Sequence, residues 1–285
     1  MPKDTMRQFQ FQQVDVFTSR PLSGNPLAVV IGADGLPDEQ MAALARWTGL
    51  SETTFLLEPT RPEADYRVRI FTQRRELPFA GHPTLGTCHV WLATGGKPRG
   101  EAIVQECGVG LVPIRREGGR LAFAAPERRR AGPVEPELLL KIARSLRITP
   151  DAIQASQWAD NGSGWVAVLL RSRSELLALK PDYAEMAGIK IGVAAQWDPP
   201  VDGTDAQFEL RAFAPDEGVL EDPVTGSLNA SVAQWLIGAG LAPSSYVASQ
   251  GTVLGRAGRV FIEFADRDIW VGGNVVTCVE GVLTL

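Results

Sequence analysis

Two stretches of the sequence decide the fold, because they read as imperfect copies of one another. The first, RIFTQRRELPFAGHPTLG, covers residues 69–86, and the second, RAFAPDEGVLEDPVTGS, covers residues 211–227. Each begins with an arginine that is followed two residues later by a phenylalanine. Eleven residues after the arginine come Ala80 in the first copy and Asp222 in the second. This duplication predicts two similar halves that face one cleft.

Length and composition agree with two halves. A chain of 285 residues, of which 45% are hydrophobic, buries a large core and slightly exceeds what one core usually fills. The formal net charge of −5 provides no general attraction to a phosphate backbone. We therefore expect no nucleic-acid partner.

Membrane and metal association are not indicated either. The apolar runs are far shorter than the roughly 20 residues that a membrane helix needs, and residues 1–8 lack the apolar centre of a secretory signal. The three cysteines are scattered without a CxxC pair, and His82 and His89 are the two histidines. These features predict a cytoplasmic protein without a disulfide framework or a metal site.

Strands and helices alternate along the chain, and we expect a first half over residues 1–125 and a second over 137–274. Residues 126–136, rich in arginine and proline, are expected to form the linker. The final segment, 275–285, is a candidate strand that returns to the first half. The turn of each copy should open a helix, over residues 84–93 and 227–237, and residues 253–254 are expected to lie in a strand.

The two helix starts indicate a site for an anion. A helix N-terminus leaves backbone N–H groups without partners inside the helix and carries a partial positive charge. Gly81 and Gly226 would let a ligand approach this backbone closely. Two such ends in matched positions predict a small, carboxylate-bearing ligand.

Beyond these copies, the chain resembles the PhzF-like family, which is named for a phenazine-biosynthesis isomerase. The resemblance extends from residue 14 to 260 and rests on the segments VDVFTSRPLSGNPLAVV, SETTFLL, RIFTQRRELPFAGHPTLG, RAFAPDEGVLEDPVTGS and SQGTVLGRAGRV. It implies an α+β fold of the diaminopimelate-epimerase type. That fold has two pseudo-symmetric domains, each a mostly antiparallel sheet wrapped around a central helix, with the active site in the interdomain cleft.

The resemblance also implies roles for individual residues. Glu52 would be the general acid/base, and His82, Asp222 and Ser227 would surround the substrate. Of these, His82 and Asp222 are expected to be catalytic, by orienting polar groups of the substrate or stabilising the charge that develops on it. The wider set of residues implied to bind substrate is Asn25, Gly81, Pro83, Thr84, Thr225, Gly226 and Ser227. In isolation these residues have simpler interpretations: Glu52 as an exposed or capping carboxylate, Asp222 as a helix N-cap, and His82 and Asn25 as turn residues.

Epimerases of this fold use one cysteine in each half as their bases, whereas this chain has Ala80 and Asp222 in the corresponding turns. We therefore expect a cofactor-independent isomerase that moves a proton on a small carboxylate-bearing metabolite. The alternatives are an epimerase or racemase in which Asp222 is one base, and a non-enzymatic metabolite-binding or scaffold protein. No nucleotide motif is present, and a homodimer is the expected assembly.

Overall fold

The computed structural model describes residues 6–285 and divides the chain into two compact units. The first five residues, part of the segment without a signal pattern, lie outside the described residues. The first unit contains the described chain up to Leu22, Pro26–Phe123 and Asn274–Leu285. The second contains Ser23–Asn25 and Ala124–Gly273, so it includes residues 126–136, which were expected to link the two halves.

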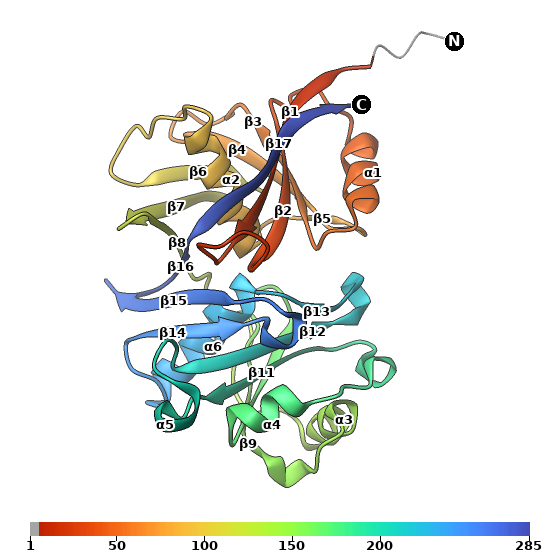
Figure 1. Ribbon diagram of the computed structural model, residues 1–285, viewed down its shortest axis with the longest axis vertical. Coiled ribbons are helices and arrows are strands. Elements are labelled where there is room, and N and C mark those ends of the chain that lie inside the picture. The colour runs from red at the N-terminus through yellow and green to blue at the C-terminus, as the bar shows by residue number, and fades with distance from the viewer. Residues whose placement is uncertain (1–5) are drawn as a thin grey trace. The chain divides into compact units, whose positions relative to one another are not determined.

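The first unit is a mixed sheet with two long helices (Figure 1). Its elements are β1 (Gln8–Val16), β2 (Asn25–Ile31), α1 (Asp38–Thr48), β3 (Thr53–Leu57), β4 (Tyr66–Phe71), β5 (Glu76–Leu77), α2 (Gly81–Ala93), β6 (Ile103–Cys107), β7 (Gly110–Glu117), β8 (Arg120–Ala124) and β17 (Val275–Thr284). The C-terminal strand β17 runs antiparallel beside β1, from the pair Gln8 and Thr284 to the pair Val16 and Val275.

The second unit has the same kind of architecture. Its helices and strands are α3 (Pro136–Leu146), β9 (Ile153–Trp158), β10 (Trp165–Leu170), α4 (Arg173–Ala178), β11 (Lys190–Gln196), α5 (Pro199–Asp202), β12 (Phe208–Ala214), β13 (Val219–Asp222), α6 (Gly226–Gly238), β14 (Ser245–Gln250), β15 (Gly258–Ala265) and β16 (Asp268–Gly273). Short 3₁₀ turns occupy Pro150–Ala152, Tyr183–Met186, Pro215–Glu217 and Thr252–Leu254.

Strand pairing repeats from one unit to the other. In the first unit, β2 and β3 pair in parallel, β3 and β4 antiparallel, β4 and β6 in parallel, and β6 and β7 antiparallel. In the second unit, β10, β11, β12, β14 and β15 pair in the same order of directions. The duplicated segments of the sequence are therefore the β4–α2 and β12–α6 parts of two equivalent sheets.

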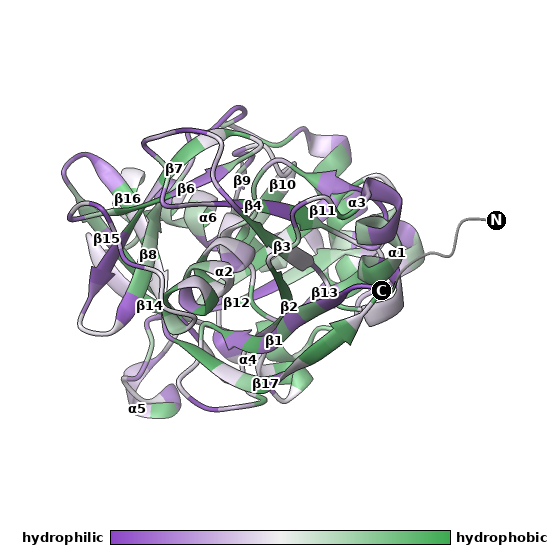
Figure 2. Ribbon diagram, turned by 90° about the horizontal axis from the view of Figure 1, so that it is seen from above, coloured by the Kyte–Doolittle hydropathy of each residue, from purple (hydrophilic) through white to green (hydrophobic). Residues whose placement is uncertain are grey.

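A buried helix occupies the middle of each unit. Most residues of α2 and α6 are buried, including Leu85, Cys88 and Val90 in α2, as expected for a helix that is apolar on all sides. Helix α2 contacts β1, β3, β4 and β17. In Figure 2 it lies beside β1, β3 and β4. Helix α6 contacts β15 and β16.

Glycines permit this close packing of helix and strand. A Cβ atom on Gly86 of α2 would lie 2.5 Å from Leu27 and 3.0 Å from Val16. In the second unit, the glycine lies on the strand instead, since a Cβ atom on Gly192 of β11 would lie 2.2 Å from Leu228 of α6. The separations of 2.5 Å at Gly86 and 2.2 Å at Gly192 are too short for any larger residue unless the neighbouring leucine moves.

Residues 253–254 are not in a strand, and this prediction was wrong. They belong to the 3₁₀ turn Thr252–Leu254, which is bounded by Gly251 and Gly255, both in the left-handed region with φ of 91° and 71°. The two apolar residues are exposed, so they supply no strand face. The strand of this region is β14, which ends at Gln250.

Residues 126–136 are bound to the rest of the second unit by backbone hydrogen bonds and packing. The amides of Arg129 and Arg130 both donate to the carbonyl of Asp160, at 2.7 and 3.1 Å. Val134 is buried and packs in the core that contains Ile142 and Leu146 of α3. The proline and arginine content that indicated a linker therefore belongs to an ordered surface segment of this unit.

The first residue of each repeat is an arginine that forms the same kind of ion pair in both units. Arg69 donates to both carboxylate oxygens of Glu76 at 2.7 and 2.6 Å, and Arg211 donates to both oxygens of Glu221 at 2.8 and 2.7 Å. Each guanidinium also lies over the phenylalanine two residues later. The two arginines therefore stabilise the β4–β5 and β12–β13 hairpins.

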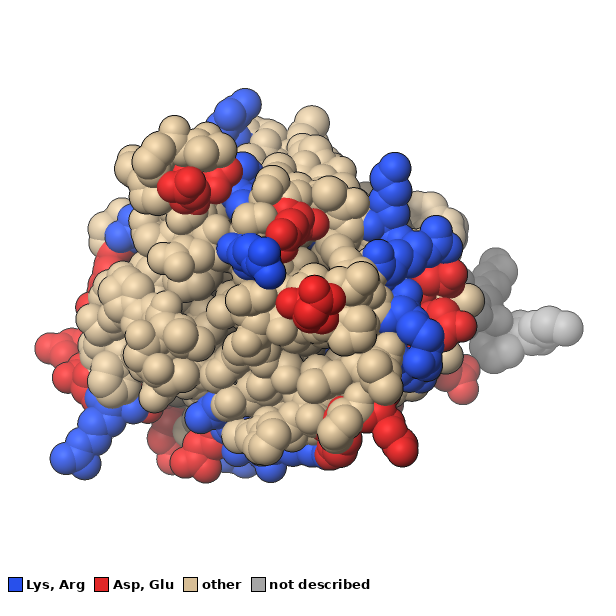
Figure 3. All heavy atoms as spheres, turned by 90° about the horizontal axis from the view of Figure 1, so that it is seen from below, with Lys and Arg blue, Asp and Glu red and all other residues tan. Residues whose placement is uncertain are grey.

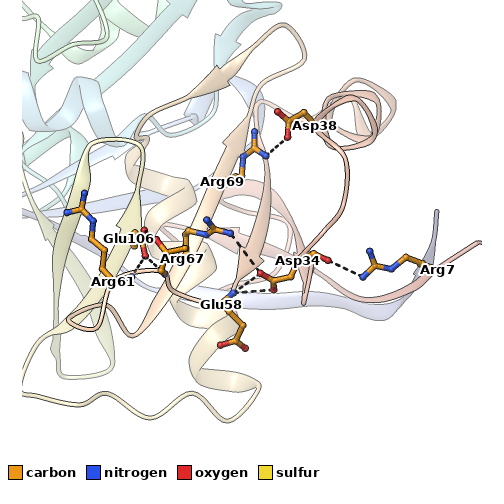
Figure 4. Close-up of polar contacts among 9 residues, drawn as sticks. Arg7, Asp34, Asp38, Glu58, Arg61, Arg67, Arg69 and Glu106 are labelled. Carbon is orange, nitrogen blue, oxygen red and sulfur yellow. Dashed lines mark hydrogen bonds and ion pairs between the residues drawn. The ribbon is translucent and has the colours of Figure 1, made fainter.

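Charged contacts in the first unit extend beyond this pair, as Figure 4 shows. Arg69 also donates to Asp38 at the start of α1, at 2.5 Å. The Asp34 carboxylate accepts from the amide of Glu58 and lies 3.9 Å from Arg67. On the face seen in Figure 3, uncharged side chains cover most of the surface, and several basic side chains lie next to one another at the right with acidic side chains beside them. Within residues 6–285, no helix has the length and apolar character needed to cross a membrane.

Candidate functional site

Glu52 and His82 lie side by side in the first unit. Glu52 directly precedes β3, and His82 is the second residue of α2. Glu52 Oε2 and His82 Nε2 are 3.6 Å apart, and the two side chains are 16% and 4% exposed. This separation exceeds a hydrogen-bond distance, so the structure places a carboxylate and an imidazole in contact at the N-terminus of the central helix.

Burial determines the protonation state of the histidine. It lowers the pKa of His82 from its ordinary value of 6.5 to about 3, because removal from water disfavours the charged imidazolium. His82 is therefore neutral at pH 7, with one ring nitrogen as a donor and the other as an acceptor. Glu52 faces a neutral polar partner that can donate to, or accept from, a bound ligand.

The second unit brings together Asn25, Asp222 and Thr225. Asn25 Nδ2 donates to Asp222 Oδ1 at 2.9 Å and to the Val224 carbonyl at 2.9 Å. The Thr225 hydroxyl donates to Asp222 Oδ2 at 2.6 Å. Asn25 is fully buried, whereas Asp222 is half-buried at the end of β13. Asp222 is not the N-cap of α6, because that position belongs to Thr225, whose side chain makes no capping bond.

The remaining residues implied to bind substrate lie at the starts of the two central helices. Gly81 and Pro83 are buried in the first turn of α2, and Gly226 is the first residue of α6. Ser227 is half-buried, and its hydroxyl accepts from Trp165 Nε1 at 3.0 Å. Thr84 is fully buried and its hydroxyl accepts from Gln105 Nε2 at 3.0 Å, so that hydroxyl serves the packing of α2.

Four polar residues that support these positions were missed by the sequence reasoning. They are Gln105, Trp165, Asn229 and Gln250, and they contact Thr84, Ser227 or Thr225 through the hydrogen bonds of their side chains. Gln250 is part of the segment SQGTVLGRAGRV, which was singled out only for the family resemblance. The signal available in the sequence was the glutamine directly before Gly251 in this segment.

The cysteines do not occupy the turns before the central helices. Cys88 lies inside α2, where burial raises the pKa of its thiol to about 12. Cys107 ends β6, and burial raises its pKa as well. Cys278 lies in β17. A pair of thiolate bases, one at each helix start, is therefore not built into this chain.

Comparison with known proteins identifies the family. The family model described as phenazine biosynthesis-like protein matches residues 14–281. The chain belongs to the PhzF family. One relative, trans-2,3-dihydro-3-hydroxyanthranilate isomerase from Pseudomonas fluorescens, is 33% identical, with 95% of this chain and 98% of the relative covered.

Two further comparisons agree with this family and its fold. Antisense-enhancing sequence 1 of Schizosaccharomyces pombe is 34% identical, with 97% of this chain and 99% of that protein covered. A solved structure of a predicted epimerase from Pseudomonas aeruginosa has a TM-score of 0.75 and 28% identity, and covers 96% of this chain and 99% of its own. The fold is thus that of PhzF and the related epimerases. The relatives that are named as isomerases support the assignment of this chain as an isomerase.

Proposed function

We propose that this PhzF-family protein is a cofactor-independent isomerase that moves a proton within a small carboxylate-bearing metabolite. The observation that carries the proposal is the contact between the Glu52 carboxylate and the neutral, buried His82 at the start of α2. A carboxylate that is largely removed from water is suited to accept a proton from carbon and to return it. Glu52 is the single general acid/base of this reaction.

The proton transfer proceeds in two steps, removal of a proton by Glu52 and its return to another carbon. Glu52 accepts a proton from a carbon next to a double bond, and the electron pair of the broken C–H bond moves into the allylic system, so that the double bond shifts. Glu52 then returns the proton to the far carbon of that system. His82 stabilises charge that develops on the substrate by donating an N–H, which a neutral imidazole does without carrying a charge itself.

The family and the two helix starts support a proposal for the substrate class. The Pseudomonas fluorescens relative is named for trans-2,3-dihydro-3-hydroxyanthranilate, a cyclic, unsaturated carboxylate. The first backbone N–H groups of a helix attract a carboxylate, and α2 and α6 begin at Gly81 and Gly226. We propose a substrate of this chemical class, oriented with the help of Asp222 and Ser227.

The test is an incubation of the purified protein with trans-2,3-dihydro-3-hydroxyanthranilate in heavy water, followed by mass spectrometry and product analysis. A panel of other small unsaturated and cyclic carboxylates is run beside it. Glu52→Gln is expected to lower turnover by at least about 100-fold, because removal of a general acid/base costs 10²–10⁴ in rate. Glu58→Gln, an exposed glutamate in the same unit, is the control and should retain the activity.

The outcomes separate the possible functions. A product with a shifted double bond, absent with Glu52→Gln, supports the isomerase, and deuterium at the far carbon shows that the proton on Glu52 exchanges with solvent before it is returned. Deuterium at a stereocentre with inversion would instead favour an epimerase in which Asp222 is a base, the alternative suggested by the epimerase-like fold. Binding of the carboxylates without turnover in either protein would contradict the enzymatic proposal and favour a metabolite-binding role.

A further inference from the structure

The side chain of Gln250 is buried beneath the turn that carries Asp222. It is the last residue of β14, it is 1% exposed, and it pairs with Leu210 of β12. Its amide makes four hydrogen bonds. Oε1 accepts from the Thr225 amide at 3.0 Å and from Asn229 Nδ2 at 2.9 Å, while Nε2 donates to the Asp222 carbonyl and to Thr225 Oγ1, each at 3.0 Å.

Two backbone groups determine which way this amide points. The Thr225 N–H can only donate, so the atom of Gln250 that faces it is the oxygen. The Asp222 carbonyl can only accept, so the atom that faces it is the nitrogen. The orientation of the amide therefore follows from the backbone of the turn itself.

This orientation fixes the direction of the hydroxyl of Thr225. Because an amide NH₂ group only donates, Thr225 Oγ1 is the acceptor in its bond with Gln250. The hydroxyl proton of Thr225 is then directed to Asp222 Oδ2, at 2.6 Å. Asn25 Nδ2 donates to the other carboxylate oxygen, Oδ1. Asp222 thus accepts at both oxygens, at Oδ2 through the chain of donors that starts at Gln250 and at Oδ1 from Asn25.

The first unit has a glutamine that contacts its central helix without forming such a chain. Gln105 of β6 pairs with Tyr66, three residues before Arg69, whereas Gln250 pairs with Leu210, one residue before Arg211, so the two glutamines occupy different strand positions. Gln105 Nε2 donates to Thr84 in the first turn of α2. The residue at the matching place in α6 is Asn229, which donates to Gln250. Gln105 thus links α2 to strand β6, whereas Gln250 is also linked, through Thr225, to the carboxylate of Asp222.

We infer that Gln250 is a positioning residue that holds Asp222 as a hydrogen-bond acceptor in a single orientation, by setting the direction of the Thr225 hydroxyl. The inference rests on the proposed function in so far as Asp222 orients the substrate. The hydrogen-bond chain itself is a property of the folded protein. Two substitutions separate this role from simple support of the turn.

Gln250→Leu removes all four hydrogen bonds, whereas Gln250→Glu retains an acceptor for the Thr225 amide and for Asn229 but replaces the NH₂ donor. With Gln250→Glu, the Thr225 hydroxyl can turn to the new carboxylate and release Asp222. The matched control is Gln207→Leu, since the side chain of the half-buried Gln207 accepts from the Val247 amide of β14 at 2.8 Å and takes part in none of the hydrogen bonds described for the Asp222 turn.

The kinetic experiment measures turnover of trans-2,3-dihydro-3-hydroxyanthranilate by the full-length protein. Both Gln250 variants are expected to lower kcat by roughly 10- to 100-fold, the order of loss caused by misplacement of an orienting group. KM should change by less than kcat, and Gln207→Leu should affect neither. The activity of Gln250→Glu relative to the unaltered protein should recover as the pH falls, because a protonated glutamate donates to Thr225 again.

A second experiment does not depend on activity. The side-chain amide signals of Asn25, recorded by ¹⁵N NMR, should shift with Gln250→Glu because the accepting carboxylate has moved, and remain in place with Gln207→Leu. Amide exchange at Thr225 should accelerate with Gln250→Leu only. Unshifted Asn25 signals with Gln250→Glu, or turnover equal to that of the unaltered protein, would overturn the inference. If the unaltered protein has no turnover, the proposed function fails while the NMR result still decides the role of Gln250.

Discussion

At the scale of single residues, a buried neutral histidine makes the stability of the protein depend on pH. His82 is nearly inaccessible to water, and burial lowers its pKa to about 3, against an ordinary value of 6.5. Between these two values, the unfolded chain binds a proton at this position that the folded chain does not. The free energy of unfolding therefore rises with pH across this window, by up to about 1.4 kcal/mol per pH unit from this residue.

Chemical denaturation between pH 3.5 and 7.5 checks this expectation. The difference in unfolding free energy between the unaltered protein and His82→Asn should grow in favour of the unaltered protein as the pH rises to about 6.5, and then level off. Above pH 5 the ring signals of His82 should not titrate in an NMR experiment. A His82 titration near pH 6.5 would contradict the buried, neutral state.

At the scale of structural elements, the two repeat arginines form the same ion pair in different surroundings. Arg211 and Glu221 are 3% and 5% exposed, whereas Arg69 and Glu76 are 25% and 41% exposed. Loss of one partner from a buried pair leaves a buried charge without compensation, which costs about 3–5 kcal/mol. Exposed pairs contribute at most about 1 kcal/mol.

We therefore expect Glu221→Gln to lower the free energy of unfolding by about 3–5 kcal/mol, and Glu76→Gln by no more than about 1 kcal/mol. Denaturant titrations of the two variants and of the unaltered protein provide the comparison. Each variant is the control for the other, because both substitutions remove the carboxylate of the strand residue that pairs with the phenylalanine of the repeat. Equal losses would show that burial does not determine the contribution of this pair.

Several elements were predictable because their signals are local. The apolar patterns of residues 53–57, 66–71 and 165–170 predict strands, and the structure has strands with these bounds. The central helices begin within three residues of the positions expected from the repeats. The apolar pair at 253–254 misled the prediction, since two flanking left-handed glycines close a 3₁₀ turn there. Strand β11 was not predicted, because periodicity alone does not distinguish a short continuous apolar stretch, such as residues 191–195, from a buried segment of a helix.

At the scale of the whole molecule, the chain ends in the unit in which it begins. Strand β17 pairs with β1 along its length and contacts α2. Deletion of residues 275–285 should therefore lower the free energy needed to open β1 and α2 locally by about 1.4 kcal/mol or more. The rate of hydrogen exchange at the most protected amides of β1 and α2 should then increase by at least about tenfold. Helix α6 and strands β10 to β12, in the second unit, should keep their protection. Hydrogen-exchange mass spectrometry of the full and shortened chains measures this, and an equal loss in both units would contradict the assignment of β17.

The duplication, the two central helices and the family can be recognised without the structure, because they depend on residue types at fixed spacings along the chain. It also identified Glu52, His82, Asn25 and Asp222 as candidate site residues through the family resemblance. The burial that keeps His82 neutral beside Glu52, and the hydrogen bonds by which Gln250 controls Asp222 through Thr225, are apparent only in the folded chain. Burial and hydrogen-bond direction depend on neighbours that are distant in sequence, such as Asn25 and Asp222, which lie 197 residues apart. No local pattern encodes such contacts.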